Sequence, residues 1–151
     1  MATKINFNGE IHDQLSISVL DHGFLFGDSV YEVVCTINNQ PCFLEKHLDR
    51  LFASAKAISL NIPHDNEWFR EQLKVTLGAA DNDESYIRII VTRGIGEINI
   101  DPTTCHSPNI IIIVMAVKEY PEPCYEKGIH VALVSIKRNA RDALNPNVKT
   151  G

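Results

Sequence analysis

The chain has 151 residues, which is enough for one compact domain with a hydrophobic core and too few for two ordinary domains. Hydrophobic residues make up 44% of the sequence and charged residues 22%, as is usual for globular proteins. The 14 basic and 19 acidic side chains give a formal net charge of −5 without any basic run, so we expect no nucleic-acid partner. The longest apolar run, residues 110–117, is too short to cross a bilayer, so we expect no membrane partner.

Residues 1–14 become polar before any apolar stretch of useful length, which argues against a signal peptide. Without such a signal, we expect a cytoplasmic protein with reduced thiols, although the spacing of the four cysteines leaves disulfides open. The cysteines form no C-x-x-C pair and the six histidines are dispersed, so we expect no metal site.

Turn-forming asparagines mark two predicted β-hairpins early in the chain. Asn8-Gly9 lies between apolar residues, which is the pattern of a tight hairpin turn. Residues 29–44 predict a strand, a turn at Asn38-Asn39 and a second strand.

Two helices are predicted next. Residues 45–60 place apolar side chains three and four residues apart, which is the period of an amphipathic helix. Residues 65–77 repeat an apolar side chain every four residues, and Asp65 is positioned to act as the N-cap. Pro63 lies in the connection between the two helices.

Three further strands are predicted, over residues 86–92, 110–117 and 128–136. The first alternates in part, with Tyr86 and Arg88 on one face and Ile87, Ile89 and Val91 on the other. The other two are apolar on both faces and are therefore predicted to be central strands, joined by a proline-containing turn over residues 118–128.

The order of these elements indicates the fold class. Strands cluster on either side of one helical pair and do not alternate regularly with helices. The sequence therefore predicts a single α+β domain over residues 1–151, with a mostly antiparallel sheet and two helices packed on one side. Residues 137–151 show no period and contain Pro146, so they resemble the start of a connection.

A basic cluster lies on the first predicted helix. Lys46, His47 and Arg50 occupy neighbouring positions of one helix surface, and the like charges at a spacing of four favour an anion between them. The cluster therefore suggests a phosphate or carboxylate site. The alternative is that these are ordinary solvated helix residues, paired with Glu45 or Asp49.

Glycines surround the start of the strand that contains Tyr31. Gly23 and Gly27 lie among bulky aromatic residues, which suggests close backbone approach or positive φ, or simply a tight turn beside a core tyrosine. Tyr31 and Glu32 point to opposite faces of the strand, so only one of them can face a given site.

Two more cations are candidates for a site: Arg93, which follows a predicted strand, and Lys149, which lies in an irregular segment. Arg93 ends a predicted strand, where it can hold a carboxylate or cap a turn, and Gly94 and Gly96 lack the third glycine of a dinucleotide fingerprint. A lysine becomes a Schiff-base nucleophile only when desolvation or nearby cations lower its pKa from about 10.4. Residues 145–151 alone do not show such surroundings, so Lys149 can equally be a solvated tail charge.

Taken together, four stretches resemble, in order and spacing, the class IV aminotransferases. These are the fold-type IV pyridoxal phosphate enzymes, which include branched-chain amino acid aminotransferases, D-amino acid aminotransferases and aminodeoxychorismate lyases. The stretches are DHGFLFGDSVYEVV (residues 21–34), HLDRLFASAKAI (47–58), YIRIIVTRGIGEINIDP (86–102) and KRNARDALNPNVKTG (137–151).

The resemblance assigns roles to four residues. Arg50 matches the arginine that binds the phosphate of pyridoxal 5'-phosphate, and Lys149 matches the lysine that forms the Schiff base and then shuttles a proton. Tyr31 matches a residue that lines the substrate pocket, and Arg93 falls where the family positions groups on the substrate side. The implied reaction moves an amino group from an amino acid to a 2-oxo acid.

Departures from the family pattern bear on the substrate. Cys35 replaces a basic residue that is usual in the branched-chain enzymes, and the loop after Arg93 lacks the carboxylate-trapping stretch of the D-amino acid enzymes. The loop is closer to the branched-chain group, so we favour a branched-chain-like donor. The alternatives are a D-amino acid aminotransferase, an aminodeoxychorismate lyase or a non-catalytic anion-binding domain.

Family members continue into a second domain that completes the cofactor site. We therefore expect this chain to be an N-terminal domain that ends just after the catalytic lysine, with weak or no cofactor binding alone and activity only in the full-length protein. The resemblance also implies a homodimer.

Overall fold

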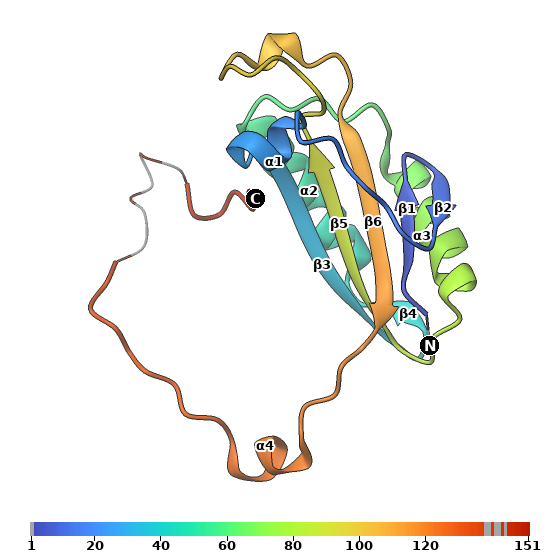
Figure 1. Ribbon diagram of the computed structural model, residues 1–151. Coiled ribbons are helices and arrows are strands. Elements are labelled where there is room, and N and C mark those ends of the chain that lie inside the picture. Colours follow the sequence, from blue (N-terminus) through green and yellow to red (C-terminus); the bar gives the residue numbers. More distant parts are fainter. Residues whose placement is uncertain (1, 138–139, 141–142, 144) are drawn as a thin grey trace.

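The computed structural model describes residues 2–137, 140, 143 and 145–151. Its centre is a six-stranded sheet in the order β2-β1-β6-β5-β3-β4, in which all neighbouring strands are antiparallel. Figure 1 shows α2 and α3 together behind this sheet. The predicted α+β fold with helices on one side is confirmed. The strands are β1 (Lys4–Phe7), β2 (Glu10–His12), β3 (Ser29–Ile37), β4 (Gln40–Pro41), β5 (Ser85–Thr92) and β6 (Asn109–Ala116), and the helices are α1 (His22–Phe26), α2 (Leu44–Ala57), α3 (Asn66–Ala80), η1 (Pro102–Thr104) and α4 (Glu122–Lys127).

Both predicted hairpin turns are present. Asn8 and Gly9 join β1 to β2 with φ angles of 52° and 98°, and Asn38 and Asn39 join β3 to β4 with φ angles of 51° and 59°. Positive φ at both central residues is the backbone of a type I′ turn, whose twist matches that of the flanking strands. The second hairpin is shorter than predicted, because β4 has only two residues.

The core lies between the sheet and helices α2 and α3. Both helices begin and end close to the predicted positions, and the side chain of Asp65 caps α3 by accepting a hydrogen bond from the Trp68 backbone N at 3.0 Å. Alternate residues of β3, β5 and β6 point into this core, as the period of two requires. The largest fully buried apolar side chains are Phe69, Leu48, Leu51, Leu73, Ile87, Ile89, Ile110, Ile112, Val30 and Val34.

The other face of the sheet is more open. The intervening residues of β3 and β5 are half-buried or exposed, and Tyr31 and Arg88 both belong to this face. Glu32, by contrast, points into the helical side and is fully buried. The predicted opposition of Tyr31 and Glu32 is therefore confirmed.

The prediction of a strand over residues 128–136 is wrong. These residues form no strand and are highly exposed, with Leu133 at 104% and Val131 at 87%. A strand requires a partner edge, and no strand within the described residues pairs with this segment. The turn predicted before it contains a short helix, α4, preceded by Pro121.

Candidate functional site

The C-terminal residues return to the sheet (Figure 1). There, Thr150 forms an antiparallel bridge with Val30 at the free edge of β3. Tyr31 N donates to Lys149 O at 3.0 Å, and Gly151 N donates to Ser29 O at 3.0 Å. Lys149 N donates in turn to Ser54 Oγ of α2 at 3.2 Å. Lys149 is thus held by its backbone N to a helix and by its backbone O to a strand.

A cleft of about 930 Å³ lies beside this segment. It lies between α2, the start of β3 and the C-terminal residues, and three of the residues predicted for the site line it together. The lining residues are Tyr31, Lys46, Asp49, Arg50, Ala53, Asn145, Pro146, Asn147, Val148, Lys149 and Thr150.

Glu32 joins the cations of this cleft from the core side. Its carboxylate has no solvent exposure and accepts hydrogen bonds from Arg50 Nε, from Arg50 Nη2 at 2.7 Å and from His47 Nδ1 at 2.8 Å. Lys149 Nζ lies 3.5 Å from the same carboxylate. A buried carboxylate requires such partners, because an unpaired charge is costly away from water.

These partners decide the protonation state of Glu32. Burial raises the pKa of this carboxyl, but the hydrogen bonds from Arg50 and His47 and the charges of Lys149 and Arg50 outweigh it and lower the pKa from 4.5 to about 2. Glu32 therefore carries a negative charge at neutral pH and fixes the orientation of the Arg50 guanidinium.

The ring of Tyr31 contacts two cations. Lys149 Nζ lies 5.0 Å from the ring centroid, and Arg88 Cζ lies 4.5 Å from it. Both separations are within the range of a cation–π contact. Arg88 forms no ion pair with any acidic side chain among the described residues, so its charge is available on the open face of the sheet.

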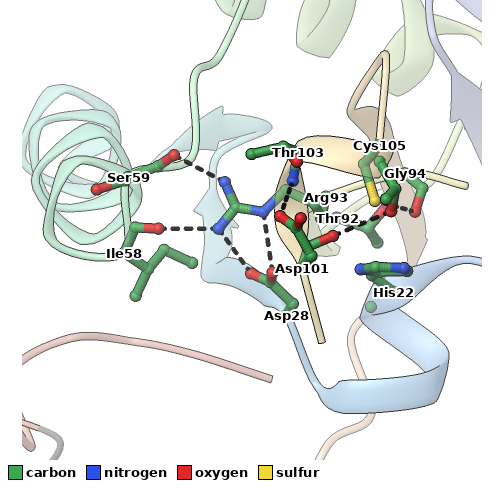
Figure 2. Close-up of polar contacts among 12 residues, drawn as sticks. His22, Asp28, Ile58, Ser59, Thr92, Arg93, Gly94, Asp101, Thr103 and Cys105 are labelled. Carbon is green, nitrogen blue, oxygen red and sulfur yellow. Dashed lines mark hydrogen bonds and ion pairs between the residues drawn. The ribbon is translucent and has the colours of Figure 1, made fainter. Parts of the chain in front are cut away.

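Arg93 is placed differently from the other predicted site residues and does not line the cleft. Figure 2 shows its guanidinium against Asp28 and the end of α2. It donates to both carboxylate oxygens of Asp28, at 2.9 and 3.0 Å, and to the carbonyl oxygens of Ile58 and Ser59, at 2.8 and 2.7 Å. The predicted contact of Arg93 with substrate stays a prediction, and the structure gives its guanidinium other partners.

The structure therefore brings Tyr31, Arg50 and Lys149 together and adds two residues that sequence reasoning did not select. Glu32 could have been found from its position, because a carboxylate on the core face of a strand needs a cation from the helix above it. Arg88 was placed on the correct face but given no role, and only the three-dimensional contact with Tyr31 identifies it.

The described ranges contain no group of three or more His, Cys, Asp or Glu side chains arranged to hold a metal ion. Within the same ranges, no helix has the length and apolar character needed to cross a membrane. All four cysteines are free thiols.

Comparison with known proteins connects this geometry to a family. The sequence model of the family described as "Amino-transferase class IV" matches residues 29–151. The chain is 37% identical over 149 residues to the "Putative branched-chain-amino-acid aminotransferase" of Methanocaldococcus jannaschii, covering 97% of this chain and 51% of that protein. It is 36% identical over 95 residues to a D-alanine aminotransferase of Listeria monocytogenes, covering 63% of this chain and 33% of that protein.

Comparison with solved structures points to the same family. The branched-chain amino acid aminotransferase of Escherichia coli superimposes with a TM-score of 0.91 at 23% identity, over 100% of this chain and 52% of that chain. The chain thus spans about half the length of the proteins that it matches. Because the family model covers more than half of the chain, including the Lys149 segment and β3, the chain belongs to the class IV aminotransferase family.

Proposed function

We propose that the whole protein, with whatever chain follows Gly151, is a pyridoxal phosphate-dependent aminotransferase. The observation that carries this proposal is the meeting of the Lys149 amine, the Arg50 guanidinium and the Tyr31 ring in one cleft. An amine that forms a Schiff base, a cation that binds phosphate and a flat apolar surface are the groups that this cofactor requires.

The residues of the cleft fit the cofactor. Arg50 uses Nε and Nη2 to bind Glu32, and within the described residues its Nη1 has no hydrogen-bond acceptor. A guanidinium that is fixed on one side and free on the other is well suited to a phosphate group. We propose that Arg50 holds the phosphate and that Lys149 forms the covalent bond.

When bound, the cofactor supplies the electron sink that stabilises negative charge at the substrate Cα. The chain's own contribution is to bind, orient and move a proton. We propose that Lys149 Nζ would take the proton from the substrate Cα as general base and would then deliver it, as general acid, to the cofactor carbon that takes up the amino group. Glu32, 3.5 Å from this amine, holds it near the start of β3.

For the substrates, we propose an amino acid donor and a 2-oxo acid acceptor, with a branched-chain-like donor favoured. The relative of highest identity named above carries the branched-chain name, which supports this choice. A D-amino acid donor is the second candidate, and the match to a D-alanine aminotransferase supports it.

We also propose a cytoplasmic homodimer. The free thiols are consistent with a reducing compartment. Apolar side chains on α1 and on the loop that follows β5 are exposed, including Phe24 at 63%, Ile98 at 75% and Ile100 at 87%. Such a surface is typical of a protein–protein interface.

The proposal is tested by adding pyridoxal 5'-phosphate to the whole protein and recording its visible absorption. We expect an absorbing complex that transfers an amino group from L-leucine to 2-oxoglutarate faster than from D-alanine to the same acceptor. A higher rate with D-alanine would support the second candidate. Pyruvate release from aminodeoxychorismate without amino transfer would instead indicate a lyase, and the absence of any absorption change at saturating cofactor would contradict the proposal.

Substitution of Arg88 tests the substrate side of the same site. Because Arg88 lies over Tyr31 and has no acidic partner in the described part of the chain, we propose that it binds a carboxylate of the substrate. In Arg88→Met, we expect the KM for 2-oxoglutarate to rise by roughly 10- to 100-fold, as loss of a charged hydrogen bond implies, with a smaller change in kcat. Steady-state kinetics would measure both constants.

The matched control is Arg70→Met, which removes an arginine from an exposed ion pair between α3 and α2. It should leave the KM nearly unchanged. An equal rise in KM in both variants, or no rise in Arg88→Met, would show that Arg88 does not bind the substrate.

A further inference from the structure

Arg93 fixes the C-terminal end of α2. The last carbonyl groups of a helix lack donors within the helix and carry partial negative charge, so a cation that donates to them stabilises that end. Ile58 is the C-cap of α2, and Ser59 follows it with a φ of 53°. Arg93 binds both carbonyls, one turn beyond Ser54, the residue that accepts the hydrogen bond of Lys149 N.

Arg93 also fixes the start of β3. Asp28 directly precedes this strand, and Arg93 binds it twice, through the guanidinium and through a backbone hydrogen bond from Arg93 N to Asp28 O at 2.9 Å. The next residue, Ser29, accepts the hydrogen bond from Gly151 N at 3.0 Å. The Arg93–Asp28 contact therefore lies next to the point where the C-terminal segment pairs with the sheet.

The end of α2 and the start of β3, which Arg93 fixes, both bind the backbone of Lys149. Lys149 is bound through its backbone N to α2 and through its backbone O to β3, and Arg93 joins these two elements to each other. The side chain of Arg93 is 11% exposed and that of Asp28 is 23% exposed, so water competes little for the pair. Figure 2 shows the guanidinium between the end of α2 and Asp28.

We propose that Arg93 and Asp28 are positioning residues, which set the place of the Lys149 amine relative to Arg50 without touching substrate or cofactor. This inference rests on the proposed function. In this inference, Arg93 affects catalysis through the position of the Lys149 amine and not through a contact with the substrate. Such an effect can be large, because displacement of a reacting group by about 1 Å can lower a rate by about 100-fold.

The first test needs no cofactor and therefore does not depend on the proposed function. In the whole protein, amide hydrogen exchange of residues 149–151 is compared between wild type, Arg93→Lys, Asp28→Asn and the control Arg70→Met. We expect exchange about tenfold faster at Lys149 N and Gly151 N in the first two variants, because the hydrogen bonds of these amides to Ser54 and Ser29 open more often, and no change in the control. Unchanged exchange in both Arg93→Lys and Asp28→Asn would overturn the inference.

Arg70 is a suitable control because it also joins two elements, through a bidentate pair with Glu45 of α2. It thus reports what loss of an ordinary bridging arginine does to stability. Arg93→Lys keeps the positive charge and at least one hydrogen bond, so it should fold where a neutral substitution fails.

The second test uses the protein loaded with pyridoxal 5'-phosphate. In Arg93→Lys and Asp28→Asn, we expect kcat to fall by roughly 10- to 100-fold with KM values within about threefold of wild type, and the pH midpoint of the visible absorption to shift. The double variant should be no worse than the more affected single variant, because the two residues act as one unit. A rise in KM with normal kcat and absorption would identify Arg93 as a substrate-binding residue and overturn the inference.

The two tests distinguish failure of the proposed function from failure of the positioning role of Arg93 and Asp28. If wild type fails to bind the cofactor while exchange of residues 149–151 changes in the variants as expected, the proposed function fails and the positioning contact stands. If wild type binds cofactor and transfers amino groups while neither exchange nor kcat changes in the variants, the proposed function stands and the positioning role is wrong.

Discussion

Replacement of Lys149 by alanine is expected to lower kcat for amino transfer by about 10³-fold or more, because it removes the group that we propose as both the nucleophile and the proton-transfer group. The fold should survive. Lys149 is one of three side chains that contact the Glu32 carboxylate, and Arg50 and His47 would still donate hydrogen bonds to it. The measurement is the steady-state rate with saturating cofactor, beside a thermal unfolding curve.

The covalent bond gives a second measurement of the same prediction. After reduction with borohydride, the cofactor should be found by peptide mass mapping on the segment that contains Lys149 in wild type and on no segment in Lys149→Ala. Lys46 also lines the cleft, so Lys46→Ala tests whether the attachment site is correctly assigned. Attachment that disappears in Lys46→Ala and persists in Lys149→Ala would contradict the assignment.

Local patterns were sufficient for most of the fold. The turns at Asn8-Gly9 and Asn38-Asn39 require positive φ, which asparagine and glycine adopt with little strain, so the sequence alone predicts them. The two helices follow from apolar spacing and from the cap at Asp65. These features depend on residues close together in the chain.

Features that depend on distant partners were less predictable. Residues 128–136 have the composition of a central strand, yet they pair with no strand in the described part of the sheet, and they are exposed. Helix α1 has only five residues, too few for a helical period, and it is recognised in the structure by its caps at Asp21 and Gly27. In both cases the sequence pattern lacks the information that tertiary contacts supply.

In the candidate site, too, some features could be predicted from the sequence and others required the structure. Arg50 and Lys149 lie 99 positions apart in the numbering, and only the family resemblance connected them before the structure placed both in one cleft. The role of Arg88 could not be inferred without the fold, because it follows from the contact with Tyr31. Arg93 shows the limit of a motif: its position at a strand end was read correctly, whereas its partners Asp28 and Ile58 come from other elements.

Glu32→Gln is expected to destabilise the protein at neutral pH and to remove part of its acid sensitivity. The folded-state pKa of Glu32 is about 2, below the ordinary value of 4.5, so the ionised carboxylate contributes stability above pH 4.5 that is lost as the pH falls toward 2. The shift corresponds to at most about 3 kcal/mol at neutral pH, and breaking a buried ion pair costs a similar amount. Because the Arg50 side chain is 49% exposed and can turn toward water, we expect a loss nearer to about 2 kcal/mol.

The measurement is urea unfolding of wild type and Glu32→Gln at a series of pH values. The difference in unfolding free energy should be largest above pH 4.5 and should shrink toward zero as the pH approaches 2, because protonation gives wild type the same neutral side chain that glutamine provides. Glu71→Gln, an exposed change on α3, controls for the loss of one negative charge and should follow wild type throughout. A difference between wild type and Glu32→Gln that stays constant across this interval would contradict the prediction, because it would mean that Arg50, His47 and Lys149 do not hold the Glu32 carboxylate ionised.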